Sequence, residues 1–360
     1  MNTHNYVFIM AGGVGSRFWP KSRNTCPKQF IDILGVGKSL LQLTWQRFQK
    51  VCPAENIFIV TNVEYRELVR EQLPELPEHN ILCEPSRNNT APGIAYAAFR
   101  IWAKDPAACM VIAPSDHFIL HEDVFVAKMK QSLEIAGSKE ILLTLGITPT
   151  RPDTGYGYIK YQQTDEAGIH KVTQFTEKPV YEKALEFLNS GNYVWNAGIF
   201  IWSAAAVLAA FEKFAPGIYE LFSKGKDIYN TEEEQSFINV HFPQSPNISI
   251  DYAIMEKADN VYTMPVDFGW SDLGTWASLY QVAEKNMEGG NVFAGGEVEL
   301  QDTEDCIIHV PNDKFAVIRG LKDFIVVDDE KVLLIYPKNS EQEIKKITEK
   351  LKEQKKIRHL

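Results

Sequence analysis

Cysteines are few in this 360-residue sequence, and their spacing excludes two common structural devices. There are five, and no pair of them forms a C-x-x-C motif. The odd, scattered set argues against a disulfide framework and against a zinc site built from cysteines. Scattered thiols are typical of a reducing compartment, so we expect a cytoplasmic protein. The cysteines are Cys26, Cys52, Cys83, Cys109 and Cys306.

Long apolar runs that could enter a membrane are also lacking. The N-terminal residues do not show the basic, apolar and small-residue order of a signal peptide. Residues 194–211 carry no charge, at the lower length limit of a membrane span, but Asn196, Gly198 and Ser203 interrupt them. We interpret this stretch as a buried strand over residues 198–202 and a helix that Ser203 caps. The sequence therefore predicts no membrane association.

Positive charge is in short supply overall. The 37 Lys and Arg residues are outnumbered by 47 Asp and Glu residues, which gives a net charge of −10. This balance argues against a nucleic-acid or membrane-surface binder, whose surface should be basic. Hydrophobic residues at 45% and charged residues at 23% are ordinary for a soluble globular protein and exclude a disordered chain.

Acidic residues are missing from the N-terminal segment, where the first is Asp32. By charge alone, chance clustering on a solvated face explains this segment best. A local site for a small anionic substrate is the alternative, because such a site needs only local positive charge. Four basic residues precede the first acid: Arg17, Lys21, Arg23 and Lys28.

Residues 1–290 alternate short apolar runs with helical patterns, which predict strands and helices in turn. Continuous apolar strands separated by helices favour an α/β fold, Rossmann-like, with a mainly parallel sheet covered on both faces. Ligands of such sheets bind beyond the carboxyl ends of the strands. We expect strands at 6–10, 56–61, 81–84, 110–113 and 141–147, and helices after Ser39 and at 64–72, 92–104 and 123–137.

The pattern changes near residue 291, where glycine pairs and short β-rich runs begin. We predict a small β domain, either a partial barrel or a β-helix-like stack, followed by a basic amphipathic helix over residues 340–358. The length suits two domains, which we place at residues 1–288 and 289–360. The β-rich runs are 306–310, 315–318, 324–327 and 332–335.

A glycine-rich loop follows the first predicted strand. Such a loop lets backbone N–H groups close on phosphate oxygens, although a simple tight turn is an equal reading of the glycines alone. The dinucleotide fingerprint G-x-G-x-x-G fails because Phe18 occupies its last position, and the Walker motif is absent. The loop comprises Ala11, Gly12, Gly13, Val14, Gly15, Ser16 and Arg17.

The segment after the loop strengthens the phosphate interpretation. Pro20 and Pro27 favour an irregular arm over a helix between Arg17 and Lys28. Backbone donors and two cations together suit a triphosphate. Phosphate binding then explains the four basic residues of this segment better than chance clustering does.

The run AGGVGSRFWPKSRNTCPKQF at residues 11–30 resembles the G-G-x-G-[ST]-R…P-K signature of the sugar-nucleotide pyrophosphorylases. Its F-W-P and P-K-Q-F forms resemble the mannose-1-phosphate guanylyltransferase branch of that family. Matching motifs follow in family order through residue 285. The resemblance implies that loop and arm hold a nucleoside triphosphate, through Ala11, Gly12, Gly13, Gly15, Ser16, Arg17 and Lys28.

The segment EPSRNNTAP at residues 84–92 resembles the family's base-binding motif. The family usually has Arg directly before Asn-Thr-Ala-Pro, whereas this chain has Asn88 there and Arg87 one place earlier. The role of Arg87 therefore stays open. The resemblance implies further nucleotide contacts at Glu84, Asn89, Thr90, Ala91 and Ser115.

Two aspartates are candidate metal ligands. Asp116 follows the strand predicted at 110–113, and Asp272 lies in the motif GWSDLGTW. Carboxylates at such positions can hold Mg²⁺, although either alone is more often a turn or helix-capping residue. The resemblance implies that Asp116 and Asp272 are the early and late metal-binding aspartates of the family. We interpret His117 as structural.

The sugar-phosphate side is implied by four further motifs. Glycines beside aromatics, as in DTGYGY, permit close approach of backbone to a ligand. The FTEKP motif offers a carboxylate and an ammonium, although such a pair is usually solvated, and N-capping is an equal role for the aspartate of SIDYAIME. The implied residues are Gly157, Glu177, Lys178, Asn196 and Asp251.

The implied reaction transfers GMP from GTP to α-D-mannose 1-phosphate, giving GDP-mannose and pyrophosphate with Mg²⁺ as cofactor. A sugar-phosphate oxygen would attack the α-phosphorus in line, and no general base is needed because the phosphate is already ionised. Catalysis then depends on positioning and charge neutralisation, with Arg17, Lys28 and Lys178 as catalytic cations.

Three alternatives stay open: the same chemistry with another base or sugar, a non-catalytic nucleotide-sugar-binding subunit, and a dehydrogenase, which the failed fingerprint disfavours. We expect no nucleic-acid partner and a homodimer, whose interface residues the sequence does not identify.

Overall fold

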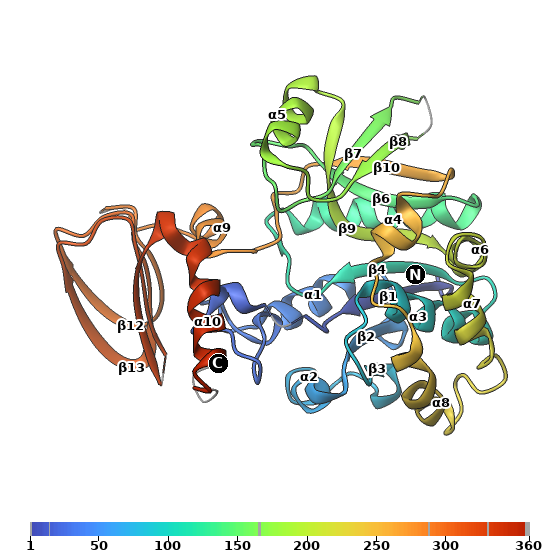
Figure 1. The fold of residues 1–360 in the computed structure, drawn as a ribbon, viewed down its shortest axis with the longest axis horizontal. Helices are drawn as coiled ribbons and strands as arrows, with labels where there is room; N and C mark the ends of the chain where they lie inside the picture. Colours follow the sequence, from blue (N-terminus) through green and yellow to red (C-terminus); the bar gives the residue numbers. More distant parts are fainter. Residues whose placement is uncertain (1, 14, 165–166, 287–288, 330, 357–360) are drawn as a thin grey trace. The chain divides into compact units, whose positions relative to one another are not determined.

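The computed structural model describes residues 2–13, 15–164, 167–286, 289–329 and 331–356 (Figure 1). The boundary predicted between residues 288 and 289 falls partly outside them. The contacts within the chain divide it into two compact units, which we describe separately. The first comprises Met1–Gly12, Trp45–Pro114 and Ile119–Trp270, and the second Gly13–Thr44, Ser115–Phe118 and Ser271–Leu360.

A nine-stranded mixed sheet forms the centre of the first unit, in the order β3-β2-β1-β4-β9-β6-β10-β8-β7 (Figure 1). Strands β3, β2, β1 and β4 run parallel, whereas β9 is antiparallel to both β4 and β6. The strands are β1 Asn5–Met10, β2 Ile57–Asn62, β3 Ile81–Glu84, β4 Cys109–Pro114, β6 Leu142–Ile147, β7 Tyr158–Gln162, β8 His170–Thr176, β9 Tyr193–Ser203 and β10 Val261–Val266.

The α/β class is confirmed, and the five strands predicted before residue 150 form within a residue or two of the expected bounds. The antiparallel pairings around β9 were not evident from the sequence, because a buried strand is apolar whichever way its neighbours run. Strand β9 also begins earlier than residue 198, so Asn196 lies inside it. The two-residue strands are β5 Phe118–Ile119 and β11 Trp270–Ser271.

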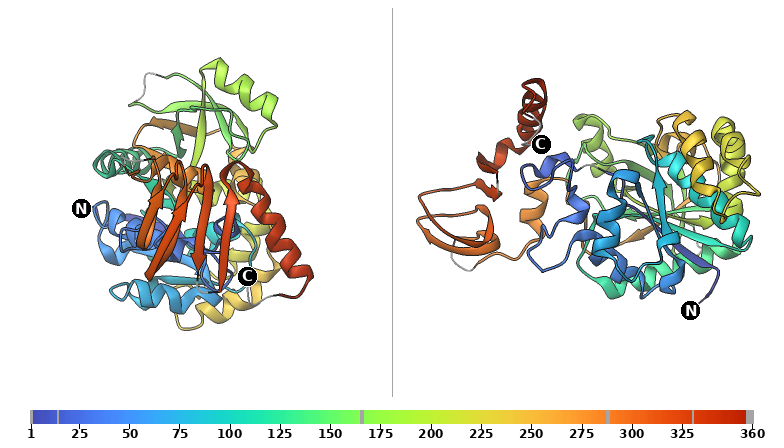
Figure 2. Two further views of the ribbon diagram at one scale, coloured as in Figure 1. Left: turned by 90° about the vertical axis from the view of Figure 1, so that its left-hand side faces the viewer. Right: turned by 90° about the horizontal axis from the view of Figure 1, so that it is seen from below.

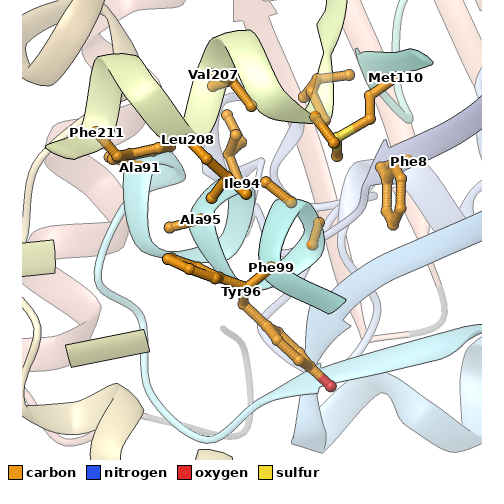
Figure 3. Packing of buried hydrophobic residues seen from close by; sticks show 14 of the residues in the cluster. Phe8, Ala91, Ile94, Ala95, Tyr96, Phe99, Met110, Val207, Leu208 and Phe211 are labelled. Atoms are coloured by element: carbon orange, nitrogen blue, oxygen red, sulfur yellow. The ribbon is translucent and has the colours of Figure 1, made fainter. Parts of the chain in front are cut away.

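Helices pack on the sheet of the first unit and form its main core. Helix α3 is buried over most of its length, and Figure 3 shows Ile94 and Ala95 of α3 facing Val207, Leu208 and Phe211 of α6. Ser203 caps α6 as expected, since its hydroxyl accepts a hydrogen bond from the Ala206 N–H at 3.1 Å. The helices are α2 Arg66–Gln72, α3 Thr90–Lys104, α4 Glu122–Ser138, α5 Tyr181–Ser190, α6 Ala204–Phe214, α7 Pro216–Ser223 and α8 Glu234–His241.

Helix α1 and several short helical turns link the strands and helices of the chain. Helix α1 spans Leu40–Phe48, and Ser39 caps it through its hydroxyl, which accepts from the Gln42 N–H at 3.2 Å. A π-helical turn at Asp251–Met255 carries one of the predicted sugar-side residues. The 3₁₀ turns are Ser16–Phe18, Lys28–Phe30, Ala54–Asn56, Val63–Tyr65, Glu78–Asn80, Phe242–Gln244 and Lys338–Glu343.

The second unit contains a four-stranded sheet in the order β12-β13-β14-β15, whose strands lie side by side in Figure 2. Strands β12, β13 and β14 are successive in the chain and parallel, as in a β-helix, and β15 returns antiparallel. The predicted runs 306–310 and 315–318 form one strand, and β12 was not predicted. The elements are β12 Val292–Gln301, β13 Ile307–Arg319, β14 Phe324–Asp329, β15 Val332–Pro337, α9 Trp276–Val282 and α10 Ile344–Glu353.

One hydrophobic cluster joins the N-terminal part of the second unit to its C-terminal sheet. Phe18 packs edge-on against Trp276, with ring centroids 4.9 Å apart. Ile344 of α10 is fully buried in this cluster, and Ile347 and Leu351 pack against it, as the amphipathic pattern predicted. The other buried members are Trp19, Ile33, Leu40, Leu273, Leu279, Ile307, Ile325, Val327 and Leu334.

None of the helices in the described residues is both long and apolar enough to span a membrane.

Candidate active site

The glycine loop and its arm are held together by local contacts. Gly15 has a φ of +60°, and a Cβ atom there would lie 2.6 Å from the Cβ of Lys28, so only glycine fits without displacing the lysine. Gln29 donates a hydrogen bond from Nε2 to the Gly13 carbonyl at 2.8 Å. The buried Ser22 hydroxyl donates to the Gly15 carbonyl. Sequence reasoning singled out neither Gln29 nor Ser22, although both lie within the signature run.

Lys28 is buried at the centre of a cluster of oxygen atoms in the second unit. Its Nζ lies 2.9 Å from Asp116 Oδ2 and donates to the backbone carbonyls of Asp272 and Leu273 at 2.8 and 2.9 Å. Burial raises the pKa of Asp116, but the charges of Lys28 and His117 and the hydrogen bond from Lys28 outweigh it, so the pKa is lowered. The structure therefore brings one predicted catalytic cation and both predicted metal ligands to one place.

The Asp272 segment has a backbone that fits only certain residues. Leu273 has a φ of +44°, and the Gly274 N–H donates to Asp272 Oδ1 at 3.0 Å. A Cβ atom on Gly274 would lie 2.6 Å from Asp272 Oδ2. The turn thereby fixes the aspartate beside Lys28.

Asp116 and Asp272 supply a donor set that suits Mg²⁺. This ion is typically bound through one or two carboxylates and completes its shell with waters and substrate phosphates. No group of three or more His, Cys, Asp or Glu side chains arranged to hold a metal occurs in the described parts of the chain. The Asp116 carboxylate at the Lys28 ammonium, with Asp272 held next to it through its backbone carbonyl, fits a magnesium ion that arrives with a phosphate.

The other predicted phosphate-side residues lie nearby in the chain but differ in exposure. Arg17 is exposed on the turn Ser16–Phe18. Ser115 is buried, and its carbonyl accepts a hydrogen bond from the Thr44 hydroxyl at 3.1 Å. The side chain of Ser16 lies outside the described part of the structure.

Glu84 is the most unusual group of the predicted base site, in the first unit. It ends β3 and is 7% exposed, and its Oε1 has no hydrogen-bond partner in the described structure. Burial raises its pKa to about 8. Cβ atoms built on Gly12 and Gly93 would lie 3.4 and 2.1 Å from its carboxyl oxygens, so these glycines make room for it. Ala11 is buried at the end of β1, with its N–H donating to the Val60 carbonyl at 2.7 Å.

Arg87 and Asn88 have separate structural roles. The Arg87 guanidinium bonds Glu64 at 2.8 Å and the Tyr65 hydroxyl at 2.9 Å, on the exposed side of the segment. The buried Asn88 amide donates to the carbonyls of Phe242 and Ser245. Asn88 thus ties the motif to a distant segment of the chain, and Arg87 is engaged by its acidic and aromatic neighbours.

Asn89, Thr90 and Ala91 begin helix α3. Asn89 caps it with a φ of +65°, and its side-chain oxygen accepts a hydrogen bond from the Thr90 N–H at 2.9 Å. The Thr90 hydroxyl accepts from the Ile250 N–H at 2.9 Å, and the Ala91 N–H donates to the Ile248 carbonyl at 3.1 Å. The motif therefore fixes the chain immediately before Asp251.

The predicted sugar-side residues form one cluster in the first unit. Asn196 donates from Nδ2 to Asp251 Oδ1 at 2.9 Å, and its N–H donates to the Gly157 carbonyl at 2.8 Å. A Cβ atom on Gly157 would lie 2.5 Å from Glu177 Oε2. Lys178, with a φ of +45°, contacts Glu177 Oε1 at 2.5 Å. All five residues implied by the resemblance thus meet, from four separate segments.

Two acidic side chains of this cluster, Glu177 and Asp251, lie close enough to repel each other. Burial, followed by the charge of Glu177, raises the pKa of Asp251 to about 6. Thr144, which sequence reasoning missed, donates its hydroxyl to Asn196 Oδ1 at 3.3 Å. No local motif marks Thr144, because its contact depends on the pairing of β6 with β9.

Comparisons with known proteins agree over nearly the whole chain. The sequence model of the family described as Nucleotidyl transferase matches residues 6–289, and that of the MannoseP isomerase/GMP-like beta-helix domain matches residues 296–351. The mannose-1-phosphate guanylyltransferase of Salmonella montevideo is 36% identical over 98% of this chain and 75% of its own length. The enzyme of the same name from Escherichia coli strain K12 is 36% identical over 96% of this chain and 73% of its own.

A solved structure agrees with these sequence matches. The crystal structure described as a mannose-1-phosphate geranyltransferase from Thermus thermophilus has a TM-score of 0.88 at 28% identity, covering 97% of this chain and 100% of that chain. The match to both domains confirms the expected fold class, including the β-helix-like C-terminal region. The chain belongs to the nucleotidyl transferase family, in its mannose-1-phosphate guanylyltransferase branch.

Proposed function

We infer that the protein transfers GMP from GTP to α-D-mannose 1-phosphate, releasing pyrophosphate and forming GDP-mannose. The observation that carries this function is the 36% identity to named mannose-1-phosphate guanylyltransferases over 96–98% of the chain. The assembled clusters around Lys28 and Asn196 support it, because they contain the residue types that two phosphorylated substrates require. The chain is therefore an enzyme of the nucleotidyltransferase class.

The reaction brings together two anions, so its main barrier is charge repulsion. An oxygen of the sugar phosphate attacks the α-phosphorus of GTP, the bond from that phosphorus to the β-phosphate oxygen breaks, and pyrophosphate leaves. Lys28 and Arg17 are proposed to neutralise the triphosphate, and Lys178 the sugar phosphate. Positioned cations and backbone donors of the glycine loop then supply most of the catalysis.

We propose Asp116 and Asp272 as the residues that hold Mg²⁺. The bound ion would neutralise phosphate charge and orient the leaving pyrophosphate. Lys28 already contacts Asp116 and the Asp272 carbonyl, so its ammonium is kept where this charge is needed. The same contacts lower the pKa of Asp116, which keeps it ionised and able to bind a cation at neutral pH.

We propose that Glu84 selects the base. Guanine presents two adjacent donors, N1–H and the N2 amino group, and Glu84 would accept both as a carboxylate after releasing the proton that its raised pKa lets it hold in the free protein. Adenine, uracil and cytosine do not offer this pair of donors. The buried Glu84 carboxyl, whose Oε1 has no partner, is suited to such recognition. A base that lacks these donors would leave the buried acid without hydrogen bonds, which costs free energy and disfavours that base.

On the sugar side, Glu177, Asn196 and Asp251 offer acceptors and donors for hydroxyl groups. Gly157 is proposed to let the sugar approach the backbone, since any side chain there would collide with Glu177. Cytoplasmic location and a homodimer are further proposals, and light scattering of the purified protein would test the second.

The function is tested by measuring pyrophosphate release with each of the four nucleoside triphosphates, paired with mannose 1-phosphate and with glucose 1-phosphate. We expect GTP with mannose 1-phosphate and added Mg²⁺ to be the best pair. Greater activity with another base or sugar would reassign the substrate. The absence of release with every pair would refute the enzymatic function.

A further inference from the structure

An ion pair connects the basic arm to the C-terminal sheet within the second unit. The Arg23 guanidinium bonds the carboxylate of Asp329, the last residue of β14. Their side chains are only 13% and 20% exposed. A pair so shielded is expected to contribute more than a surface ion pair, because solvent screens it less.

Arg23 in turn fixes the backbone of the arm. Its Nε donates to the Pro20 carbonyl at 3.2 Å, and its backbone exchanges hydrogen bonds with Cys26 at 3.0 and 3.1 Å. The preceding residue, Ser22, donates its hydroxyl to the Gly15 carbonyl. A continuous set of contacts therefore leads from β14 through Arg23 and Ser22 to the glycine loop.

Packing supports the arm from the same direction. Phe18 and Trp19, which follow the loop, share a buried cluster with Ile325 and Val327 of β14. Residues 325, 327 and 329 alternate along the strand, so Asp329 lies on the face of β14 that packs on the arm. The sheet thus contacts the arm through both apolar and charged side chains.

We propose that Asp329 is a positioning residue for GTP, which it influences by holding Arg23 and hence the glycine loop and Lys28 in the geometry that a triphosphate requires. The C-terminal β domain is then a part of the nucleotide site that touches no substrate. This inference rests on the proposed function, because it assumes that the arm binds GTP.

The neighbouring residue on the same strand provides a matched control. Asp328 lies on the opposite face of β14 and pairs with Lys314. Lys314 is 53% exposed and lies on β13, so this ion pair involves no residue of the arm. Asp328→Ala removes the same charge from the same strand, so it reproduces any general effect on the sheet or on net charge.

The test compares Asp329→Ala, Asp328→Ala, Asp329→Glu, Arg23→Met and the double variant Arg23→Met/Asp329→Ala by steady-state kinetics and by calorimetric titration with GTP. We expect Asp329→Ala to raise KM and Kd for GTP about tenfold, which is within the usual range for coupled charged partners. KM for mannose 1-phosphate should stay within about twofold, and Asp329→Glu should recover part of the loss. KM and Kd for GTP of the double variant should be no higher than those of Arg23→Met alone.

Three results would overturn the proposal. Equal kinetics for Asp329→Ala and Asp328→Ala would remove the role of the arm-facing carboxylate. Parallel loss of activity toward both substrates, with less folded protein by thermal unfolding, would assign Asp329 to stability alone. Additive effects of Arg23→Met and Asp329→Ala would show that the pair is not coupled. Failure of the unmodified protein to bind or turn over GTP would instead refute the proposed function.

Discussion

Glu84 allows the sharpest prediction, because its burial should affect both the stability of the protein and the base selection proposed for it. Its pKa of about 8, against an ordinary value of 4.5, means that the folded protein holds a proton that the unfolded chain has already released. The stability contributed by this protonation is fully present below pH 4.5. It is lost as the pH rises to about 8, because the ionised carboxylate has no partner at Oε1.

The expected magnitude follows from the shift. Each pKa unit corresponds to about 1.4 kcal/mol, so the difference between pH 4.5 and pH 8 amounts to roughly 4–5 kcal/mol at most. Glu84→Gln replaces the acid with an isosteric neutral group that does not titrate. The free energy of unfolding of the variant should therefore decline less above pH 5 than that of the unmodified protein, and the variant should gain relative stability toward pH 8.

Urea unfolding at several pH values between 5 and 9 measures this effect. Glu71→Gln serves as the control, because Glu71 is an exposed glutamate on the nearby helix α2. Its stability curve should run parallel to that of the unmodified protein. If the curve of Glu84→Gln also runs parallel, Glu84 does not carry a buried proton and the argument is wrong.

The same variant should lose selectivity for guanine. An amide can accept from only one of the two guanine donors and places its own NH₂ against the other, so we expect kcat/KM for GTP to fall about 10- to 100-fold. Activity with other triphosphates should change far less, so the ratio between GTP and ITP is the informative measurement, since ITP lacks the N2 amino group. An unchanged ratio would exclude Glu84 from base recognition.

The remaining predictions concern phosphate and sugar binding. Asp116→Ala or Asp272→Ala should abolish turnover while thermal unfolding still shows a folded protein, and unchanged rates in both would refute the metal assignment. Gly15→Ala should raise KM for GTP and destabilise the fold by about 1–3 kcal/mol, because its Cβ would meet Lys28, whereas a Cβ on Gly13 meets open space, so Gly13→Ala should leave the free energy of unfolding nearly unchanged. Asp251→Asn should flatten the pH dependence of KM for mannose 1-phosphate near pH 6. The stability that protonated Asp251 provides is present below pH 3.8 and lost as the pH rises through about 6, so unfolding of the variant should lack this decline. If Asp251→Asn keeps the full pH dependence of KM and of the free energy of unfolding, Asp251 does not cause either of them.

Much of the fold was predictable because its signals are local. The strand at residues 81–84 forms with the expected bounds as β3, and the caps at Ser39 and Ser203 form as expected, since apolar runs and capping residues act over a few positions. Strand direction is different. The antiparallel insertion of β9 depends on which strands meet in space, and a buried apolar run is compatible with either direction.

In the candidate site, too, some residues could be predicted from the sequence and others could not. Gly15, Lys28 and Asp116 could be selected because the chemistry of a phosphate site requires their residue types near the ends of strands. The neighbours that hold them could not, because no local pattern announces a long-range partner. Thr144 reaches Asn196 only through the pairing of two strands, and Arg23 finds Asp329 across 306 positions of the chain.

Arg23 also shows why net charge alone misleads. In the sequence it is one of four cations in an acid-free segment, and each of them could equally face a phosphate. In the structure Arg23 faces Asp329, Lys28 faces Asp116, and Arg17 is exposed on its turn. The segment therefore uses part of its positive charge to hold its own shape, and the rest serves the proposed substrate binding. A charge-removing substitution at Arg23 should consequently resemble Asp329→Ala in its kinetics, whereas Arg17→Met should weaken GTP binding without any coupling to Asp329.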